Sequence, residues 1–287
     1  MEEDKSAETR LPATDEKFLE VEKIIASKNK NLLKWLPGFL LNYIKRIVHE
    51  DECNRVMRRH GHLYGLEFVD NLIEDFGVNV HLTGEENIIT DRPIIYAANH
   101  PLGGLDGIAF MYILGKYRQD IQFLVNDILL NIDNLKPLFV PINKHGPQGR
   151  ERIKKIEATY AGDFAVLQFP AGLVSRKMKG GRIEDLEWKK SFISKAKKYE
   201  KDIIPVFIEG RNSNFFYNLA RLRGKLGIKA NLEMFYLVDE MFQQKGKDIT
   251  IHFGEVVEYK RFDDSKTERE WAAYMKAKTY AMDPNKK

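Results

Sequence analysis

Short apolar runs alternate with helical patterns over residues 78–208, and this alternation limits the possible folds more than any other feature of the sequence. Each run has the length and composition of a buried strand and is bounded by turn residues. The runs are residues 78–82, 94–98, 121–125, 138–142, 164–169 and 203–208. Helical patterns lie between several of them, at 107–117, 149–161 and 188–199. This order predicts an α/β fold, in which helices flank a mixed, largely parallel sheet and loops gather at the carboxyl ends of the strands.

The remaining segments suggest a three-part organisation. Residues 1–16 read as a flexible tail, residues 17–76 as an N-terminal helical region, and residues 77–287 as the α/β domain, with further strands at 249–253 and 256–259 and a closing helix at 268–280. Within the helical region, residues 28–48 combine apolar recurrence at helical spacing with Trp35 and flanking Lys and Arg residues. That pattern is typical of a helix lying in a membrane interface. A helix packed on the α/β domain has the same periodicity, so both interpretations stay open at this point.

The charge and cysteine content exclude some kinds of site. A net charge of +4 suits an anionic membrane surface or an acidic carrier protein and is weak support for nucleic-acid binding. Cys53 is the single cysteine, so neither an intrachain disulfide nor a cysteine-based metal cluster is expected. No stretch is long and apolar enough to predict a transmembrane helix, and residues 1–17 lack the apolar core of a secretory signal.

The segment from Ile94 to Gly107 carries the clearest chemistry. An apolar strand pattern ends at Asn99-His100-Pro101, a tight turn follows at Gly103-Gly104, and Asp106 precedes the next helical pattern. Histidine changes charge near neutral pH, and a carboxylate bound to one ring nitrogen leaves the other free to take a proton. The pair therefore suits a general base and its orienting group. An ordinary helix N-cap explains Asp106 equally well.

This segment resembles the first motif of the glycerolipid acyltransferase superfamily, the lysophosphatidic acid acyltransferase-like enzymes. The usual spacing there is H-x4-D, whereas five residues separate His100 from Asp106. The longer spacing is similar to that of the hemolysin-like branch, which includes acyltransferases acting on ornithine and glycine lipids. The resemblance implies the glycerolipid acyltransferase fold, with His100 as the general base and Asp106 as its partner.

A second stretch, Phe169-Pro170-Ala171-Gly172-Leu173-Val174-Ser175-Arg176, resembles the superfamily motif F-P-E-G-x-x-S. The usual Glu, which helps to hold glycerol 3-phosphate in the wider family, is Ala171 here, as it commonly is in the amino-lipid branch. Residues 138–144 and 203–210 occupy the places of the two remaining motifs, with Lys144, Arg150 or Arg152 standing for the usual Arg. The residues that the resemblance implies for substrate binding are Asn99, Gly103, Gly104, Lys144, Phe169, Pro170, Gly172, Ser175 and Arg176.

The resemblance implies an O-acyltransferase of membrane lipid biosynthesis. It would move a fatty acyl group from an acyl carrier protein or coenzyme A thioester to the hydroxyl of a lyso-lipid, with a lyso-amino-acid lipid of the glycine or ornithine type favoured. The alternatives are a 1-acyl-glycerol-3-phosphate acyltransferase, a lipid hydrolase, and a non-catalytic peripheral lipid-binding protein. We expect no cofactor, no metal and no nucleic-acid partner, and a peripheral location at the cytoplasmic face of the inner membrane.

Overall fold

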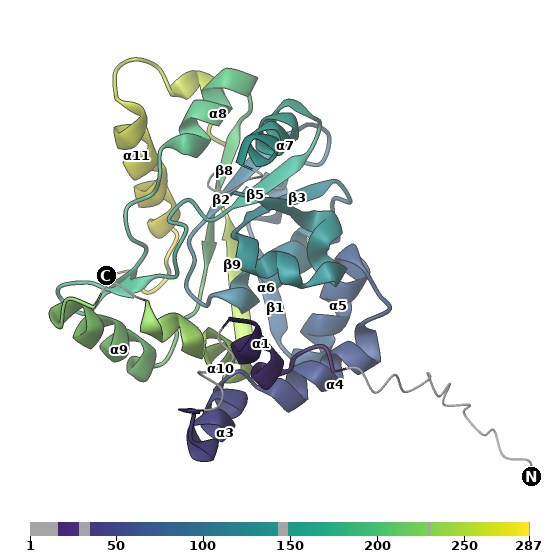
Figure 1. The fold of residues 1–287 in the computed structure, drawn as a ribbon. Coiled ribbons are helices and arrows are strands. Elements are labelled where there is room, and N and C mark those ends of the chain that lie inside the picture. Colours follow the sequence, from purple (N-terminus) through teal and green to yellow (C-terminus); the bar gives the residue numbers. More distant parts are fainter. Residues whose placement is uncertain (1–16, 29–34, 143–148, 229–230, 287) are drawn as a thin grey trace, which may run out of the picture. The chain divides into compact units, whose positions relative to one another are not determined.

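The computed structural model describes residues 17–28, 35–142, 149–228 and 231–286 (Figure 1). The chain divides into two compact units between Gly61 and His62, and each is described by itself. This boundary lies earlier than residue 76, where the sequence suggested one. The reason is that helix α5 (Gly65–Phe76) buries its apolar face in the second unit, where it packs on helix α6 (Gly104–Gly115).

The first unit contains helices α1 (Val21–Lys28), α3 (Gly38–Ile47) and α4 (Glu50–His60). The Glu50 carboxylate accepts the first amide of α1, at Val21, over 3.0 Å, which satisfies one of the unpaired donors at that helix end. The side-chain amide of Asn54 binds the backbone of Leu19 through both its oxygen and its nitrogen. Trp35 and Phe39 are largely exposed whereas Ile47 is buried, so the apolar face expected for residues 28–48 is only partly buried over its described part, residues 35–48.

A seven-stranded sheet forms the centre of the second unit, and it confirms the predicted mixed, largely parallel α/β architecture. The strands are β1 (Asn79–Thr83), β2 (Ile94–Ala98), β3 (Ile121–Val125), β4 (Phe139–Pro141), β5 (Ala165–Gln168), β8 (Ile203–Ile208) and β9 (Asp248–Phe253). Their order is β1-β9-β8-β2-β5-β3-β4, and only the β8–β9 pairing is antiparallel. A separate two-stranded hairpin joins β6 (Arg176–Lys177) to β7 (Ile183–Glu184).

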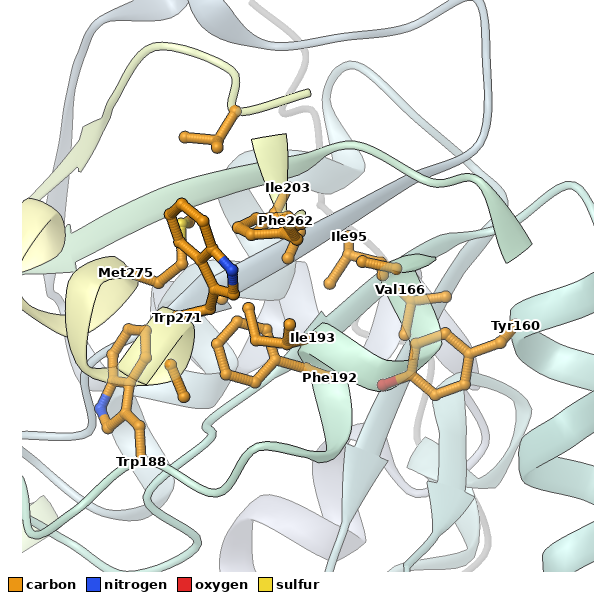
Figure 2. Packing of buried hydrophobic residues seen from close by; sticks show 14 of the residues in the cluster. Ile95, Tyr160, Val166, Trp188, Phe192, Ile193, Ile203, Phe262, Trp271 and Met275 are labelled. Carbon is orange, nitrogen blue, oxygen red and sulfur yellow. The ribbon is translucent and has the colours of Figure 1, made fainter. Parts of the chain in front are cut away.

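Both faces of the sheet are covered, which explains why its central strands are uniformly apolar. Ile95 and Ala97 of β2 pack in one core cluster with side chains of α7 (Gly149–Ala161), α8 (Ser191–Tyr199) and α11 (Glu268–Tyr280) (Figure 2). Tyr96, which points to the opposite face, makes edge-to-face contacts with Phe110 of α6 and Phe253 of β9.

The other elements of the second unit are short or inserted. Between β8 and β9 lie α9 (Asn214–Lys225), the 3-10 turn η4 (Leu232–Tyr236) and α10 (Leu237–Phe242). Further 3-10 turns are η1 (Glu85–Asn87), η2 (Asp127–Asn131), η3 (Asp133–Leu138) and η5 (Tyr259–Arg261). The strand expected at 256–259 is wrong, because only Val257 pairs there, in an isolated bridge with Ile203, before η5 begins. In the described ranges, no helix has the length and apolarity needed to span a bilayer.

Candidate active site

The two motifs meet at one edge of the sheet. Strand β2 lies between β5 and β8 and is parallel to both, so the segments that follow the three strands leave the sheet on the same side. His100 follows β2, Phe169 follows β5, and Gly210 follows β8. In open α/β sheets, ligands bind outside the carboxyl ends of the strands, which is where these residues lie.

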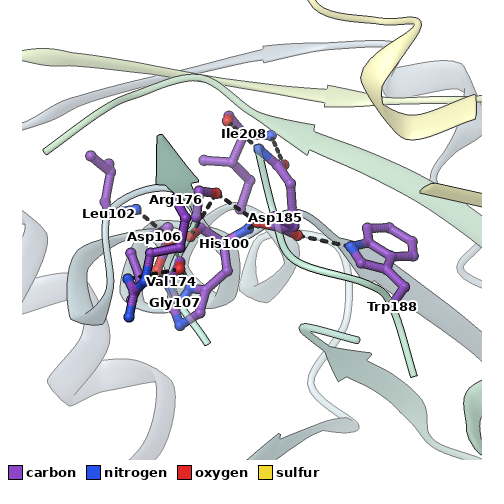
Figure 3. Close-up of polar contacts among 11 residues, drawn as sticks. His100, Leu102, Asp106, Gly107, Val174, Arg176, Asp185, Trp188 and Ile208 are labelled. Atoms are coloured by element: carbon purple, nitrogen blue, oxygen red, sulfur yellow. Dashed lines mark hydrogen bonds and ion pairs between the residues drawn. The ribbon is translucent and has the colours of Figure 1, made fainter. Parts of the chain in front are cut away.

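His100 and Asp106 are in direct contact. Nδ1 of His100 lies 2.9 Å from Oδ2 of Asp106 (Figure 3). The Asp106 carboxylate is fully buried and also accepts the amides of Leu102, over 2.9 Å, and Gly107, over 2.8 Å. An ionised carboxylate only accepts, so Nδ1 donates to it and Nε2 becomes the ring nitrogen able to take a proton. The imidazole remains 17% exposed, which leaves it accessible from outside.

Asp106 is not an N-cap. Helix α6 begins at Gly104 rather than at the expected residue 107, and its N-cap is Gly103. Gly103 has φ +85°, a conformation that side-chain-bearing residues rarely adopt, and a side chain there would come within 3.0 Å of Leu237. The early start places Asp106 in the first turn of α6, where the positive end of the helix favours a carboxylate.

Phe169 supports the imidazole from one side. Its ring is stacked on that of His100, with centroids 4.0 Å apart and planes 13° from parallel. The same phenyl ring contacts Phe123 edge-to-face at 5.2 Å, so it is itself held by the core. Phe169 and Asp106 together restrict the imidazole in both its plane and its position.

Asp185 is a further residue of the site that was not predicted from the sequence. Its fully buried carboxylate accepts from the backbone amide of His100 over 3.1 Å, from Oγ of Ser175 over 2.6 Å and from Nε1 of Trp188 over 2.8 Å (Figure 3). Burial raises the pKa of Asp185 above its usual range. No sequence signal marks it, because it follows a run of charged residues that reads as solvated surface.

Two side chains of the C-terminal helix α11 hydrogen-bond to the backbone of Asp185. The amide of Asp185 donates to the hydroxyl oxygen of Tyr280 over 2.7 Å, and Nζ of Lys276 donates to its carbonyl oxygen over 2.5 Å. Burial is the main cause that raises the pKa of Tyr280, and the nearby charge of Asp185 raises it further. The hydroxyl of Tyr280 therefore stays protonated. The backbone at His100 is therefore braced by a side chain that α11 holds in place.

Three of the residues expected to bind substrate hold the loops in place. Nδ2 of Asn99 donates to the Ile208 carbonyl over 2.9 Å and its Oδ1 accepts the Ile208 amide over 2.6 Å, which joins the ends of β2 and β8. Ser175 donates its amide to the His100 carbonyl over 2.7 Å. Pro170 is buried, and its carbonyl accepts the amide of Lys189 over 3.0 Å.

The glycines of the two motifs allow close approach. A side chain at Gly104 would come within 3.3 Å of the Met241 sulfur, and one at Gly172, where φ is +68°, within 2.8 Å of Nζ of Lys189. Lys189 thus brings a cation to the Phe169–Ser175 loop, which the sequence analysis did not anticipate. Lys144, expected to contact the acceptor, lies outside the described residues.

Arg176 is held in an ion-pair cluster. Its Nη2 lies 2.8 Å from the fully buried carboxylate of Glu233, which Arg223 also binds, at 2.9 Å through Nε. Two guanidinium groups thus share one carboxylate. Arg176, which was expected to bind substrate, thus links the hairpin to the α9–η4 insertion. Among the residues that the structure describes, no group of three His, Cys, Asp or Glu side chains is placed to hold a metal ion.

Comparison with known proteins adds four findings. The model of a family described as "Acyltransferase" matches residues 23–286. A lyso-glycine lipid O-acyltransferase of Phocaeicola vulgatus is 42% identical over 266 residues, covering 92% of this chain and 95% of the relative. One of Bacteroides thetaiotaomicron is 43% identical over 266 residues, covering 92% and 97%. The crystal structure of the 1-acyl-sn-glycerophosphate (LPA) acyltransferase PlsC from Thermotoga maritima is 18% identical, covers 91% of each chain and has a TM-score of 0.43.

Proposed function

Because the chain belongs to the acyltransferase family, within the glycerolipid acyltransferase superfamily, we propose that it transfers a fatty acyl group to the hydroxyl of a lyso-glycine lipid. The relatives of this name match the chain over nearly their whole length. Ala171, in place of the Glu that helps to hold glycerol 3-phosphate in the wider superfamily, also favours an amino-acid lipid over a glycerophosphate acceptor. The observation that carries the proposal is the 2.9 Å contact between His100 and Asp106.

In the proposed reaction His100 acts as the general base. Nε2 takes the proton of the acceptor hydroxyl, whose oxygen then attacks the thioester carbonyl carbon and forms the new ester bond. The thiolate leaves and recovers the proton from the imidazolium. Asp106 holds the tautomer through Nδ1 and stabilises the imidazolium, as a buried and multiply hydrogen-bonded carboxylate can.

The oxyanion formed on the thioester carbonyl needs nearby donors. The first turn of α6 contains Asp106, so its backbone amides and the positive end of the helix lie beside the imidazole. We assign the oxyanion to amides of the Gly103–Gly104 turn, an interaction worth about 3 kcal/mol in comparable sites. No cofactor or metal takes part in this scheme, and the donor is an acyl carrier protein or coenzyme A thioester.

The lipid acceptor calls for a peripheral membrane enzyme. Such an enzyme would meet its acceptor at the cytoplasmic face of the inner membrane, and the exposed Trp35 and Phe39 of the first unit support contact with the interface.

The test is an acyl-transfer assay in detergent micelles. The purified chain is given acyl-coenzyme A or acyl carrier protein thioester with either lyso-glycine lipid or lysophosphatidic acid, and products are identified by mass spectrometry. We expect diacylated glycine lipid and a loss of at least about a hundredfold in turnover for His100→Ala and Asp106→Asn.

The matched control is His81→Ala. His81 lies on β1 with its side chain 56% exposed, and its replacement should leave turnover unchanged. Near-normal turnover of His100→Ala would refute the mechanism. Acylation of lysophosphatidic acid alone would refute the acceptor, and release of free fatty acid without a diacylated lipid would indicate a hydrolase.

A further inference from the structure

Helix α9 presents an apolar stripe to solvent. Phe215, Leu222 and Leu226, which recur at helical spacing, are 52%, 55% and 65% exposed. The inner face of the helix is already satisfied, since Phe216, Tyr217 and Ala220 are buried in the unit. Three large apolar side chains on one outer stripe are unusual for a surface helix, whose outer face is normally polar.

The exposed stripe continues into η4. The rings of Phe215 and Tyr236 meet edge-to-face with centroids 4.9 Å apart, and the neighbouring Phe235 is 66% exposed. We call the exposed apolar side chains of α9, η4 and the segment between them the α9 surface, and define it by six residues: Phe215, Leu222, Leu226, Ile228, Leu232 and Phe235.

Helix α11 of the same unit differs from α9 in its outer face. Its large apolar side chains, Trp271 and Met275, are buried, and it turns Arg269 and Glu270 outward. The same unit therefore contains a helix whose outer face is polar, whereas the outer face of α9 carries large apolar side chains.

Positive charge borders the α9 surface. From Arg211 to Leu232, with both ends included, the sequence has five basic residues and no acidic one. Arg221 and Lys225 are exposed on α9, whereas Arg223 is engaged by Glu233. Apolar side chains edged by cations match a bilayer with anionic headgroups, because the apolar groups enter the acyl boundary while the cations stay at headgroup level.

The α9 surface is anchored next to the catalytic turn. Leu237, directly after η4, lies against Gly103, and Met241 of α10 lies against Gly104. The Arg176–Glu233 ion pair ties η4 to the loop that follows Ser175. A lipid surface in contact with α9 and η4 would thus lie beside the segment that carries His100.

From these observations we infer that the α9 surface docks the second unit, which carries His100 and is called the catalytic unit below, on an anionic phospholipid bilayer. The inference deepens the proposed function, on which it rests, by naming a lipid-contacting surface in the catalytic unit besides the N-terminal region. Docking here would present the His100 edge of the sheet to a lyso-lipid acceptor held in the bilayer.

The experiment measures partitioning of the full chain onto phosphatidylcholine vesicles with and without phosphatidylglycerol, by co-sedimentation. We expect Phe215→Ser/Leu226→Ser to lower the partition coefficient on anionic vesicles at least tenfold. Arg221→Gln/Lys225→Gln should remove most of the preference for anionic over neutral vesicles. The matched control is Tyr64→Ser/Ile153→Ser, which removes one exposed aromatic and one exposed aliphatic side chain elsewhere in the unit and should change partitioning less than twofold.

Turnover of the variants in detergent micelles, where no bilayer is needed, should stay within twofold of wild type and thereby excludes misfolding as the cause. Wild-type partitioning of Phe215→Ser/Leu226→Ser, or an equal loss in the control, would overturn the inference. So would conversion of an oligomer to monomers, or a raised KM for acyl carrier protein with unchanged vesicle binding, since these outcomes assign the surface to a second copy or to the carrier. Absence of acyl transfer by the wild type in micelles would refute the proposed function and leave the vesicle result to stand by itself.

Discussion

The imidazole of His100 lies nearly parallel to the phenyl ring of Phe169, with the two centroids 4.0 Å apart. The two residues leave the sheet from the neighbouring parallel strands β2 and β5, whose register pairs Ala97 with Gln168. Strand pairing therefore brings the second motif against the first and sets the plane of the His100 imidazole.

Replacing Phe169 by Leu should lower kcat roughly fivefold, since aromatic stacking is worth about 1 kcal/mol and Leu cannot hold the plane of the imidazole. Steady-state kinetics in micelles measure the effect. Phe139→Leu is the control, because Phe139 is a buried phenylalanine of the same aromatic group that contacts Phe123 rather than His100. Equal kcat values for the two variants would show that the stacking has no catalytic role.

Asp185→Asn should lower kcat with little change in KM. The amide oxygen can take the place of Oδ1, which accepts from His100 and Ser175, but the NH2 group then replaces Oδ2 and faces Nε1 of Trp188. This leaves a buried donor unpaired, so the group that holds the His100 backbone is itself less firmly placed. A variant that raised KM and kept kcat would contradict this positioning role.

The same variant should alter the pH dependence of stability. Because burial raises the pKa of Asp185 above 3.8, its contribution to stability is fully present below pH 3.8 and is lost as the pH rises through the raised value. The asparagine does not titrate. The stability of wild type relative to Asp185→Asn, from urea unfolding, should therefore fall with rising pH over that window, and an unchanged difference would refute the assignment.

The strands and the His100–Asp106 pair were predictable from the sequence, and the supports of the pair were not. Residues 94–98 and 203–208 are apolar throughout because both faces of the sheet are covered, so composition alone identified them. Asp185 acts on His100 across 85 positions and receives Tyr280 from 95 positions away, and no local pattern records such contacts. The ion-pair partner of Arg176 was not predictable for the same reason, since Glu233 is 57 positions distant.

Glu233→Gln should destabilise the catalytic unit. Removing a buried carboxylate leaves the Arg176 and Arg223 guanidinium groups without their shared counter-charge, which costs about 3–5 kcal/mol and lowers Tm by roughly 6 to 15 °C. Calorimetry measures the shift. Glu184→Gln, which weakens a 3.5 Å pair with the largely exposed Arg182, should change Tm by less than about 2 °C. Similar shifts in both variants would contradict the importance of burial.

Glu157→Gln should lose stability in a pH-dependent way, with the sign opposite to that of Asp185. The Glu157 carboxylate, which lies on α7, accepts from Lys195, Tyr199 and Lys198 of α8, and these hydrogen bonds hold its pKa at about 2, below the usual 4.5. A lowered pKa contributes stability above pH 4.5 that is lost as the pH falls toward about 2.

Wild type should thus be more stable than Glu157→Gln at pH 7, by about 1 kcal/mol after allowance for solvent screening at this partly exposed site. The difference in urea midpoint should shrink below pH 4.5 and also on addition of salt. Glu255→Gln is the control, because Glu255 is 85% exposed and lies 3.6 Å from Lys278, too open for a measurable effect. A difference between wild type and Glu157→Gln that persisted unchanged to pH 3 would show that the three donors do not stabilise the ionised carboxylate, and that α7 and α8 are joined by packing alone.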